Sequence, residues 1–194
     1  MEVAVIKYNA GNVKSVLYAM ERLGANAILT DDWETIKKAD KVIFPGQGEA
    51  STAMAYLKER NLDQLIKELQ QPFFGICLGL QLLCEHSEEY DTSCLGVFPI
   101  KVKKFPPEDK VPHIGWNNLK NLKSPLLNGL DESAYLYFVH SYYAEVDPLY
   151  TIAITDYITE FSALLHKDNY YAMQAHPEKS SFPGEKILTN FLNL

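Results

Sequence analysis

Residues 73–81 read FFGICLGLQ, and this stretch decides the fold that we expect for the chain. The apolar run 73–76 is typical of a buried strand, and the apolar spacing after Cys77 is typical of a helix. Cys77 has a glycine two residues to either side of it. A strand, a glycine-flanked turn and a helix form a nucleophile elbow, in which the residue at the turn is exposed for attack.

The alternation of strand and helix continues on both sides of this stretch. Toward the N-terminus, strands are expected at residues 3–6, 26–29 and 41–44, with helices at 12–24, 32–39 and over about twenty residues that end before Pro72. A helix over 78–89 follows the elbow. Strands separated by helices predict an α/β fold, an open, mostly parallel, doubly wound sheet with helices on both faces.

The second half of the chain has a different pattern. Short strand-like segments are expected within 97–105, 134–146, 150–157, 161–168 and 170–176, followed by a final helix over 184–194. Their connections are too short for helices, which predicts a smaller mixed or antiparallel sheet region. Because the chain has no repeat and no Gly/Ser linker, we expect a single domain over residues 1–194.

Composition narrows the classes of function. The formal net charge of -7 argues against binding to nucleic acid or an anionic membrane surface, and no apolar stretch is long enough to span a bilayer. The three cysteines form no C-x-x-C pair, and the histidines and cysteines lack metal-ligand spacing on any one element. We therefore expect no metal, no cofactor and a reducing compartment, the cytoplasm. The first residues read as a strand rather than as a signal peptide.

Cys77 has two interpretations when its pentapeptide is taken alone. It is either a nucleophile at a helix N-terminus, where the backbone N–H groups favour an anion, or a buried structural cysteine, which is the commoner fate of a free thiol. Cys84, seven residues on, fits the buried interpretation better.

A cysteine nucleophile needs a base and a group that orients the base. His176 follows an expected strand and precedes Pro177, which favours an extended backbone at His176. In extended chain, residues two apart project to the same side, so Glu178 would lie beside the His176 ring. The alternative is a plain turn with a solvated glutamate.

The segment PGQG at 45–48 completes the pattern. Its two glycines allow the backbone N–H groups to approach a ligand, as an oxyanion hole requires, although such a segment is more often an ordinary turn. The PGQG segment, Cys77 and His176 each follow an expected strand. They could therefore meet at the carboxyl edge of the sheet, where open α/β sheets place their sites.

Together these motifs resemble those of the class I glutamine amidotransferases, which combine a G-x-C-x-G elbow, a C-terminal H-P-E pair and a P-G-x-G oxyanion loop. The resemblance covers nearly the whole chain. One branch of the family, which works in histidine biosynthesis, is resembled most specifically, through YNAGN at 8–12, GICLGLQLL at 75–83, PHIGWN at 112–117, YFVHSYY at 137–143 and HPEKS at 176–180. The chain departs from the usual family pattern at Asn9, Ala50 and Ala175.

The resemblance implies that Cys77 attacks the side-chain amide of L-glutamine, that His176 transfers protons and that Glu178 holds His176. It also implies three further groups of residues. The oxyanion hole would use backbone N–H groups of Gly46, Gln47, Gly48 and Leu78. The substrate would contact Gln81, Glu89, Ser141 and Tyr142. The partner protein would contact Asn12, Trp116, Tyr137 and Lys179.

The implied partner is a (β/α)8-barrel synthase subunit, which forms a heterodimer with the glutaminase. The barrel would use the ammonia to form imidazole glycerol phosphate and aminoimidazole carboxamide ribotide. Because Gln47 is a non-glycine residue in the oxyanion loop, we expect low activity until the partner binds its own substrate. Three alternatives remain at this point: a glutaminase for the pyridoxal phosphate or aminobenzoate pathway, a silent regulatory module, and a cysteine peptidase.

The segment HIGWN at 113–117 has two interpretations of its own. His113 and Trp116 could form a buried polar cluster, since tryptophan is usually buried, or they could belong to an interface.

Overall fold

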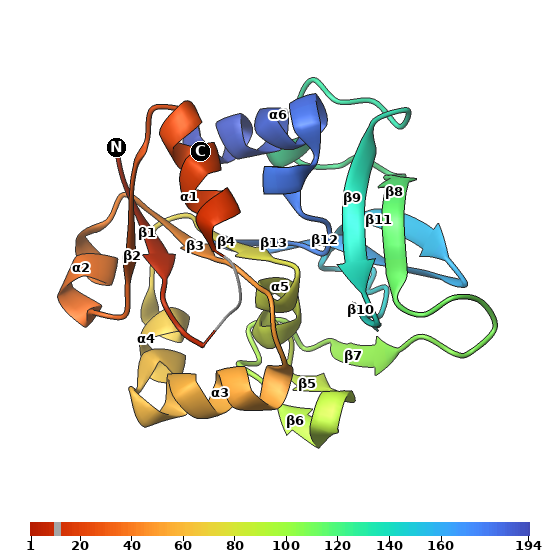
Figure 1. Ribbon diagram of the computed structural model, residues 1–194, viewed down its shortest axis with the longest axis horizontal. Helices are drawn as coiled ribbons and strands as arrows, with labels where there is room; N and C mark the ends of the chain where they lie inside the picture. Colours follow the sequence, from red (N-terminus) through yellow and green to blue (C-terminus); the bar gives the residue numbers. More distant parts are fainter. Residues whose placement is uncertain (10–12) are drawn as a thin grey trace.

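The computed structural model describes residues 1–9 and 13–194 and is built around a seven-stranded sheet with strand order β11-β12-β13-β4-β3-β1-β2 (Figure 1). The five strands from β13 to β2 are parallel, β12 runs antiparallel to β13, and β11 runs antiparallel to β12. The strands of this sheet are β1 (Glu2–Ile6), β2 (Asn26–Thr30), β3 (Lys41–Phe44), β4 (Phe73–Ile76), β11 (Thr151–Tyr157), β12 (Thr159–Lys167) and β13 (Tyr170–Met173). The predicted α/β fold class is confirmed.

Helices cover both faces of the sheet. They are α1 (Lys14–Arg22), α2 (Trp33–Lys38), α3 (Ala50–Glu59), α4 (Leu62–Glu68), α5 (Leu78–Leu83) and α6 (Ser181–Leu192), with short 3-10 turns at Glu89–Asp91, Pro125–Leu127 and Pro177–Lys179. Helices α1 and α6 lie side by side on one face, and α3, α4 and α5 lie on the other (Figure 1).

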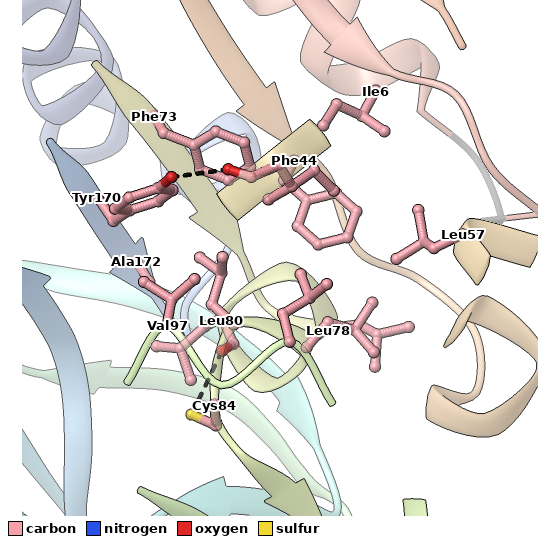
Figure 2. Close-up of a cluster of buried hydrophobic side chains, with 14 of the residues drawn as sticks. Ile6, Phe44, Leu57, Phe73, Leu78, Leu80, Cys84, Val97, Tyr170 and Ala172 are labelled. Carbon is pink, nitrogen blue, oxygen red and sulfur yellow. Dashed lines mark hydrogen bonds between the residues drawn. The ribbon is translucent and has the colours of Figure 1, made fainter. Parts of the chain in front are cut away.

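Alternating side chains of the parallel strands supply two separate cores. Along β1, Ala4 and Ile6 pack toward α3 and α4, whereas Val3 and Val5 pack toward α1 and α6. Figure 2 shows part of the first core, in which the Cys84 thiol lies 3.5 Å from the Leu80 carbonyl oxygen. Cys84 is therefore the buried structural cysteine that its position on the elbow helix predicts.

Two smaller sheets complete the second half of the chain. One has the order β10-β7-β5-β6, with β5 (His86–Ser87), β6 (Thr92–Ser93), β7 (Lys101–Lys104) and β10 (Tyr142–Ala144). The other is an antiparallel pair of β8 (His113–Asn118) and β9 (Tyr135–His140). The predicted mixed region is thus present.

Two sequence predictions of local structure are wrong, and one strand was not predicted. The single helix expected before Pro72 is two helices, because Asn61 adopts a left-handed conformation with φ 54° between α3 and α4. The helix expected over 78–89 ends at Leu83, because His86 and Ser87 pair with β7 instead. Strand β8 was not predicted.

No helix within residues 1–9 and 13–194 is both long enough and apolar enough to cross a membrane.

Candidate active site

Cys77 occupies a strained turn between β4 and α5. Its backbone has φ 52° and ψ −107°, a conformation that non-glycine residues rarely adopt and that is typical of the residue at a nucleophile elbow. The Cys77 N–H donates to the Met173 carbonyl at 2.7 Å and continues the pairing of β4 with β13. The sheet therefore holds the strained residue in place.

The glycines around the elbow are required by close packing. A Cβ atom on Gly79 would overlap the Phe44 carbonyl oxygen, and one on Gly46 would lie 2.5 Å from the backbone nitrogens of Leu78 and Gly79. Only a residue without a side chain lets the end of β3 and the start of α5 come this close. The PGQG segment is thereby held against the N-terminus of α5, beside Cys77.

His176 and Glu178 form the pair that the H-P-E motif predicts. His176 Nδ1 lies 2.8 Å from Glu178 Oε1, and the Glu178 side chain retains only 4% of its exposure. The backbone at His176 is extended, with φ −99° and ψ 91°, as expected before a proline. Among the residues that the structure describes, none makes a hydrogen bond with His176 Nε2, which leaves that nitrogen for proton transfer.

The electrostatics of His176 suit a thiolate–imidazolium pair. Burial lowers its pKa, but the neighbouring Cys77 and the Glu178 carboxylate outweigh burial and raise the pKa to about 10. The raised pKa favours the charged form of the ring. A charged imidazole beside a cysteine stabilises the anionic sulfur, which is the attacking form.

A cavity of about 330 Å³ brings most of the expected site residues together. Its lining includes Gly46, Gln47, Gly48, Cys77, Leu78, Gln81, Glu89, Ser141, Tyr142 and His176. The PGQG segment, the elbow and His176 follow β3, β4 and β13, which are adjacent parallel strands, so their convergence at the carboxyl edge is confirmed.

One side of this cavity, the polar wall, is formed by Gln81, Glu89, Ser141 and Tyr142. Hydrogen bonds hold two of these side chains in place. Gln81 Nε2 donates to the Tyr142 carbonyl at 2.9 Å, and the Ala50 N–H donates to Glu89 Oε2 at 2.7 Å. Burial raises the pKa of Glu89, partly offset by the bond from Ala50. Tyr8 holds the PGQG segment, because its hydroxyl donates to the Pro45 carbonyl at 2.5 Å.

The residues expected at the partner face lie in different places. Trp116 on β8 is 52% exposed and packs edge-on against Tyr137 on β9, so the interpretation of Trp116 as buried is wrong. His113, by contrast, is buried, and its Nδ1 lies 3.1 Å from His140 Nε2. Lys179 is partly buried in the turn after His176, and Asn12 lies outside the described residues.

Sequence reasoning missed Gln174. It is fully buried, and its Nε2 lies 3.6 Å from Cys77 Sγ. The signal was present in the sequence, because the strand expected within 170–176 places Gln174 two residues before His176 and on the same side.

The fold, and the placement of a strained cysteine beside a histidine–glutamate pair, fit a cysteine-dependent amidotransferase, and comparison with known proteins agrees. The family model described as class-I glutamine amidotransferase matches residues 4–194. The chain therefore belongs to the class I glutamine amidotransferase family.

Particular members of the family are closely similar along their full length. The imidazole glycerol phosphate synthase subunit HisH of Bacteroides fragilis strain YCH46 is 58% identical over 197 residues, which cover 100% of both chains. The subunit of that name from Bacteroides thetaiotaomicron is 57% identical with the same coverage. In Legionella pneumophila strain Paris, the subunit HisH 2 is 46% identical, covering 99% of this chain and 98% of its own.

More distant solved structures share the fold. A crystal structure described as that of a glutamine amidotransferase superposes with a TM-score of 0.77 and 21% identity, covering 98% of this chain and 97% of that one. A glutamine amidotransferase from Thermotoga maritima superposes with a TM-score of 0.71 and 14% identity, covering 100% of this chain and 96% of its own.

Proposed function

We propose that this chain is the glutaminase subunit of an imidazole glycerol phosphate synthase and supplies ammonia for histidine biosynthesis. The observation that carries the proposal is one cavity that joins the strained Cys77, the Glu178-held His176 and the PGQG segment. The full-length identity of 58% to a subunit of that enzyme supports the choice of pathway.

The chemistry follows from the roles that we assign to these residues. The Cys77 thiolate attacks the side-chain amide carbon of glutamine, and backbone N–H groups of Gly46 to Gly48 and of Leu78 stabilise the resulting oxyanion. Charged His176 protonates the departing ammonia, which leaves a γ-glutamyl thioester on Cys77. Neutral His176 then takes a proton from water as that water hydrolyses the thioester. Glu178 keeps the ring oriented throughout.

The polar wall determines which substrate fits. Gln81, Glu89 and the backbone of Ser141 and Tyr142 bind the amino-acid end of glutamine, opposite the nucleophile. Glu89 supplies a carboxylate for the substrate ammonium, and its bond from the Ala50 N–H holds it in place.

The second subunit that we propose is a (β/α)8 barrel. Ammonia that escapes into neutral water becomes ammonium and loses its nucleophilicity, so the two sites must be joined by a sealed interface. The outward side of the β8–β9 hairpin fits this role, because it exposes Ile114, Trp116 and Tyr135 beside Val139, which lines the cavity. Lys179 and Asn12 are assigned to the same interface.

We place the reaction in the cytoplasm, because all three cysteines are free thiols and the proposed nucleophile must stay reduced. We also treat residues 1–194 as one domain, since both cores are built on the same sheet.

Ammonia release tests the function. The rate is measured with L-glutamine for the chain alone, for the chain with the barrel subunit, and for the complex with the barrel's nucleotide substrate, and the last is expected to be fastest. Cys77→Ala should abolish release in all three, whereas Cys84→Ala should retain it if the variant folds. Retained turnover by Cys77→Ala would refute the assigned nucleophile. Stimulation only by a synthase of another pathway would refute the assigned pathway.

A further inference from the structure

A pair of buried side-chain amides connects Cys77 to the wall of the substrate cavity. Gln174 Nε2 lies 3.6 Å from Cys77 Sγ, and Gln174 Oε1 accepts from Gln81 Nε2 at 3.1 Å. Gln81 Nε2 also donates to the Tyr142 carbonyl at 2.9 Å. We propose that Gln174 is a positioning residue that orients the Cys77 sulfur and fixes which end of the Gln81 amide faces the substrate. This inference rests on the proposed glutaminase function.

Only one orientation of the two amides satisfies this series of hydrogen bonds. The Tyr142 carbonyl can only accept, so the NH2 group of Gln81 must face it. The same NH2 group faces Gln174, which must therefore present its oxygen there. The NH2 group of Gln174 is then left pointing at the Cys77 sulfur. Turning either amide over would place two NH2 groups, or two oxygens, against each other.

The first consequence concerns the substrate. Both hydrogens of the Gln81 amide are used within the protein, so Gln81 Oε1 is the polar atom that this side chain can offer to the cavity. An oxygen with no hydrogen accepts from an N–H donor, such as the ammonium of the amino acid. By fixing the orientation of the Gln81 amide, Gln174 makes this part of the cavity selective for a hydrogen-bond donor on the substrate.

The second consequence concerns the nucleophile. Val139 presents a carbonyl oxygen 3.9 Å from Cys77 Sγ, and that oxygen can only accept a hydrogen bond. A thiolate has no hydrogen to give, so the Val139 contact becomes unfavourable on ionisation, whereas the Gln174 N–H contact becomes stronger. Two titratable groups also interact with Cys77, namely His176 and Tyr8. The Tyr8 hydroxyl already donates to Pro45, so Gln174 adds a neutral donor to the charge of His176.

Strand register explains why this residue can act there. Met173 pairs with Ile76 across the parallel strands, which brings Gln174 alongside Cys77. Gln174 and His176 both follow β13, which ends at Met173, and so approach the sulfur from the same strand end. Gln174 retains none of its exposure, so its amide cannot exchange these partners for water.

The test compares Gln174→Met, which removes both amide functions, with Gln174→Glu, which is the same size and keeps an acceptor for Gln81. The first readout is the rate at which iodoacetamide alkylates Cys77 in the full chain without glutamine, followed by mass spectrometry across pH, with buried Cys84 as an internal control. Gln174→Met is expected to slow alkylation by about fivefold or more, because the thiolate loses the N–H donor of Gln174.

The second readout is the steady-state kinetics of glutamine hydrolysis in the complex with the barrel subunit. Gln174→Met should raise the glutamine KM about fivefold, because Gln81 is no longer held by an acceptor. Gln174→Glu should slow alkylation while leaving the KM within about twofold of the wild type, because a carboxylate still accepts from Gln81. Gln70→Met, at an exposed position beyond α4, should change neither quantity.

Each outcome decides the inference. Wild-type alkylation rates in folded Gln174→Met would overturn it, and so would a lowered melting temperature with no change in alkylation or KM, which would mark a purely structural role. If Gln174→Met does not fold, the size-matched Gln174→Glu decides by its alkylation rate. If the wild-type chain shows no glutaminase activity but Gln174→Met still slows alkylation, the proposed function is refuted. The inference that Gln174 acts on Cys77 then still stands.

Discussion

The backbone N–H of His176 donates to the carbonyl oxygen of Tyr137 at 2.9 Å. Tyr137 lies on β9, whose outward side carries the proposed partner face, and the bond therefore joins that face to the proposed base. Ser180 closes the connection, since its hydroxyl accepts from the Tyr137 N–H at 2.9 Å and donates to the His176 carbonyl at 2.6 Å. The position of His176 thus depends on the position of β9.

Ser180→Ala tests this dependence. Ser180 is fully buried, and its loss would leave the Tyr137 N–H without the acceptor that it has now. The expected cost is about 1–3 kcal/mol in the free energy of unfolding, measured by urea titration, together with a reduced kcat for glutamine hydrolysis. The neighbouring Ser181→Ala, at an exposed position, is the matched control. Equal effects of the two substitutions would contradict the connection.

Glu178→Gln tests the orienting carboxylate. The amide keeps the shape and can still accept from His176 Nδ1, but its charge is lost. Since Glu178 contributes to the raised pKa of His176, that pKa should fall, and the alkaline limb of the pH–rate profile should move to lower pH. We expect kcat to drop on the order of 10²- to 10⁴-fold. Glu185→Gln, exposed on α6, should leave both unchanged, and a profile that does not move would assign Glu178 no electrostatic role.

Gly79→Ala tests the close packing of the elbow. The added methyl group would overlap the Phe44 carbonyl, which is backbone and cannot turn aside. We expect a loss of about 3 kcal/mol or more in the free energy of unfolding. Gly96→Ala is the control, because its methyl group would meet open space and cost only the strain of φ +70°, about 1 kcal/mol. A smaller loss for Gly79→Ala than for Gly96→Ala would contradict the packing argument.

The local sequence pattern was sufficient to predict the elbow, but it was not sufficient to predict features that depend on distant residues. The strand, turn and helix of FFGICLGLQ are decided by residues within the stretch, and the meeting of Cys77 with His176 follows from the parallel sheet. The end of α5 could not be predicted from nearby residues, because residues 86–87 pair with β7 instead of continuing the helix.

Side-chain exposure was harder to predict than the presence of the parallel strands. Trp116 and Ile114 face outward from β8, which reverses the usual rule that large apolar residues point inward. Because of this reversal, β8 was not recognised in the sequence. The same outward-facing residues mark the proposed interface. The contact of Gln174 with Cys77 depends on the register between β13 and β4, and the order and register of strands had to come from the structure.

The buried histidine pair on β8 and β9 predicts acid sensitivity. Burial lowers the pKa of His113 to about 4 and that of His140 to about 3, against about 6.5 for an unfolded histidine. Between these values the unfolded chain binds more protons than the folded one, so stability falls as pH drops from 6.5 toward 4, by at most about 1.4 kcal/mol per pH unit for each ring. His176, whose pKa is raised, is charged in both states well below pH 6.5, so its contribution to stability does not change with pH there.

His113→Asn isolates this contribution. Urea titrations between pH 7 and pH 4 should show a shallower loss of stability for the variant than for the wild type. His166→Asn, on the partly exposed end of β12, keeps the total of histidines equal and should retain the steep slope. Parallel curves for the wild type and His113→Asn would show that His113 does not contribute to the acid sensitivity.

Trp116→Ala tests the proposed partner face. The ring is 52% exposed and contacts Tyr137 edge-on, so its removal leaves no cavity in the core and should not unfold the chain. A large aromatic residue at the centre of an interface typically contributes about 2 kcal/mol, so the Kd for the barrel subunit should rise about 30-fold by calorimetry. Leu149→Ala removes a more exposed apolar side chain from the loop before β11 and should leave the Kd unchanged. If Leu149→Ala weakens the complex and Trp116→Ala does not, the barrel docks on another face, and the bond between Tyr137 and His176 would then not connect the partner to the base.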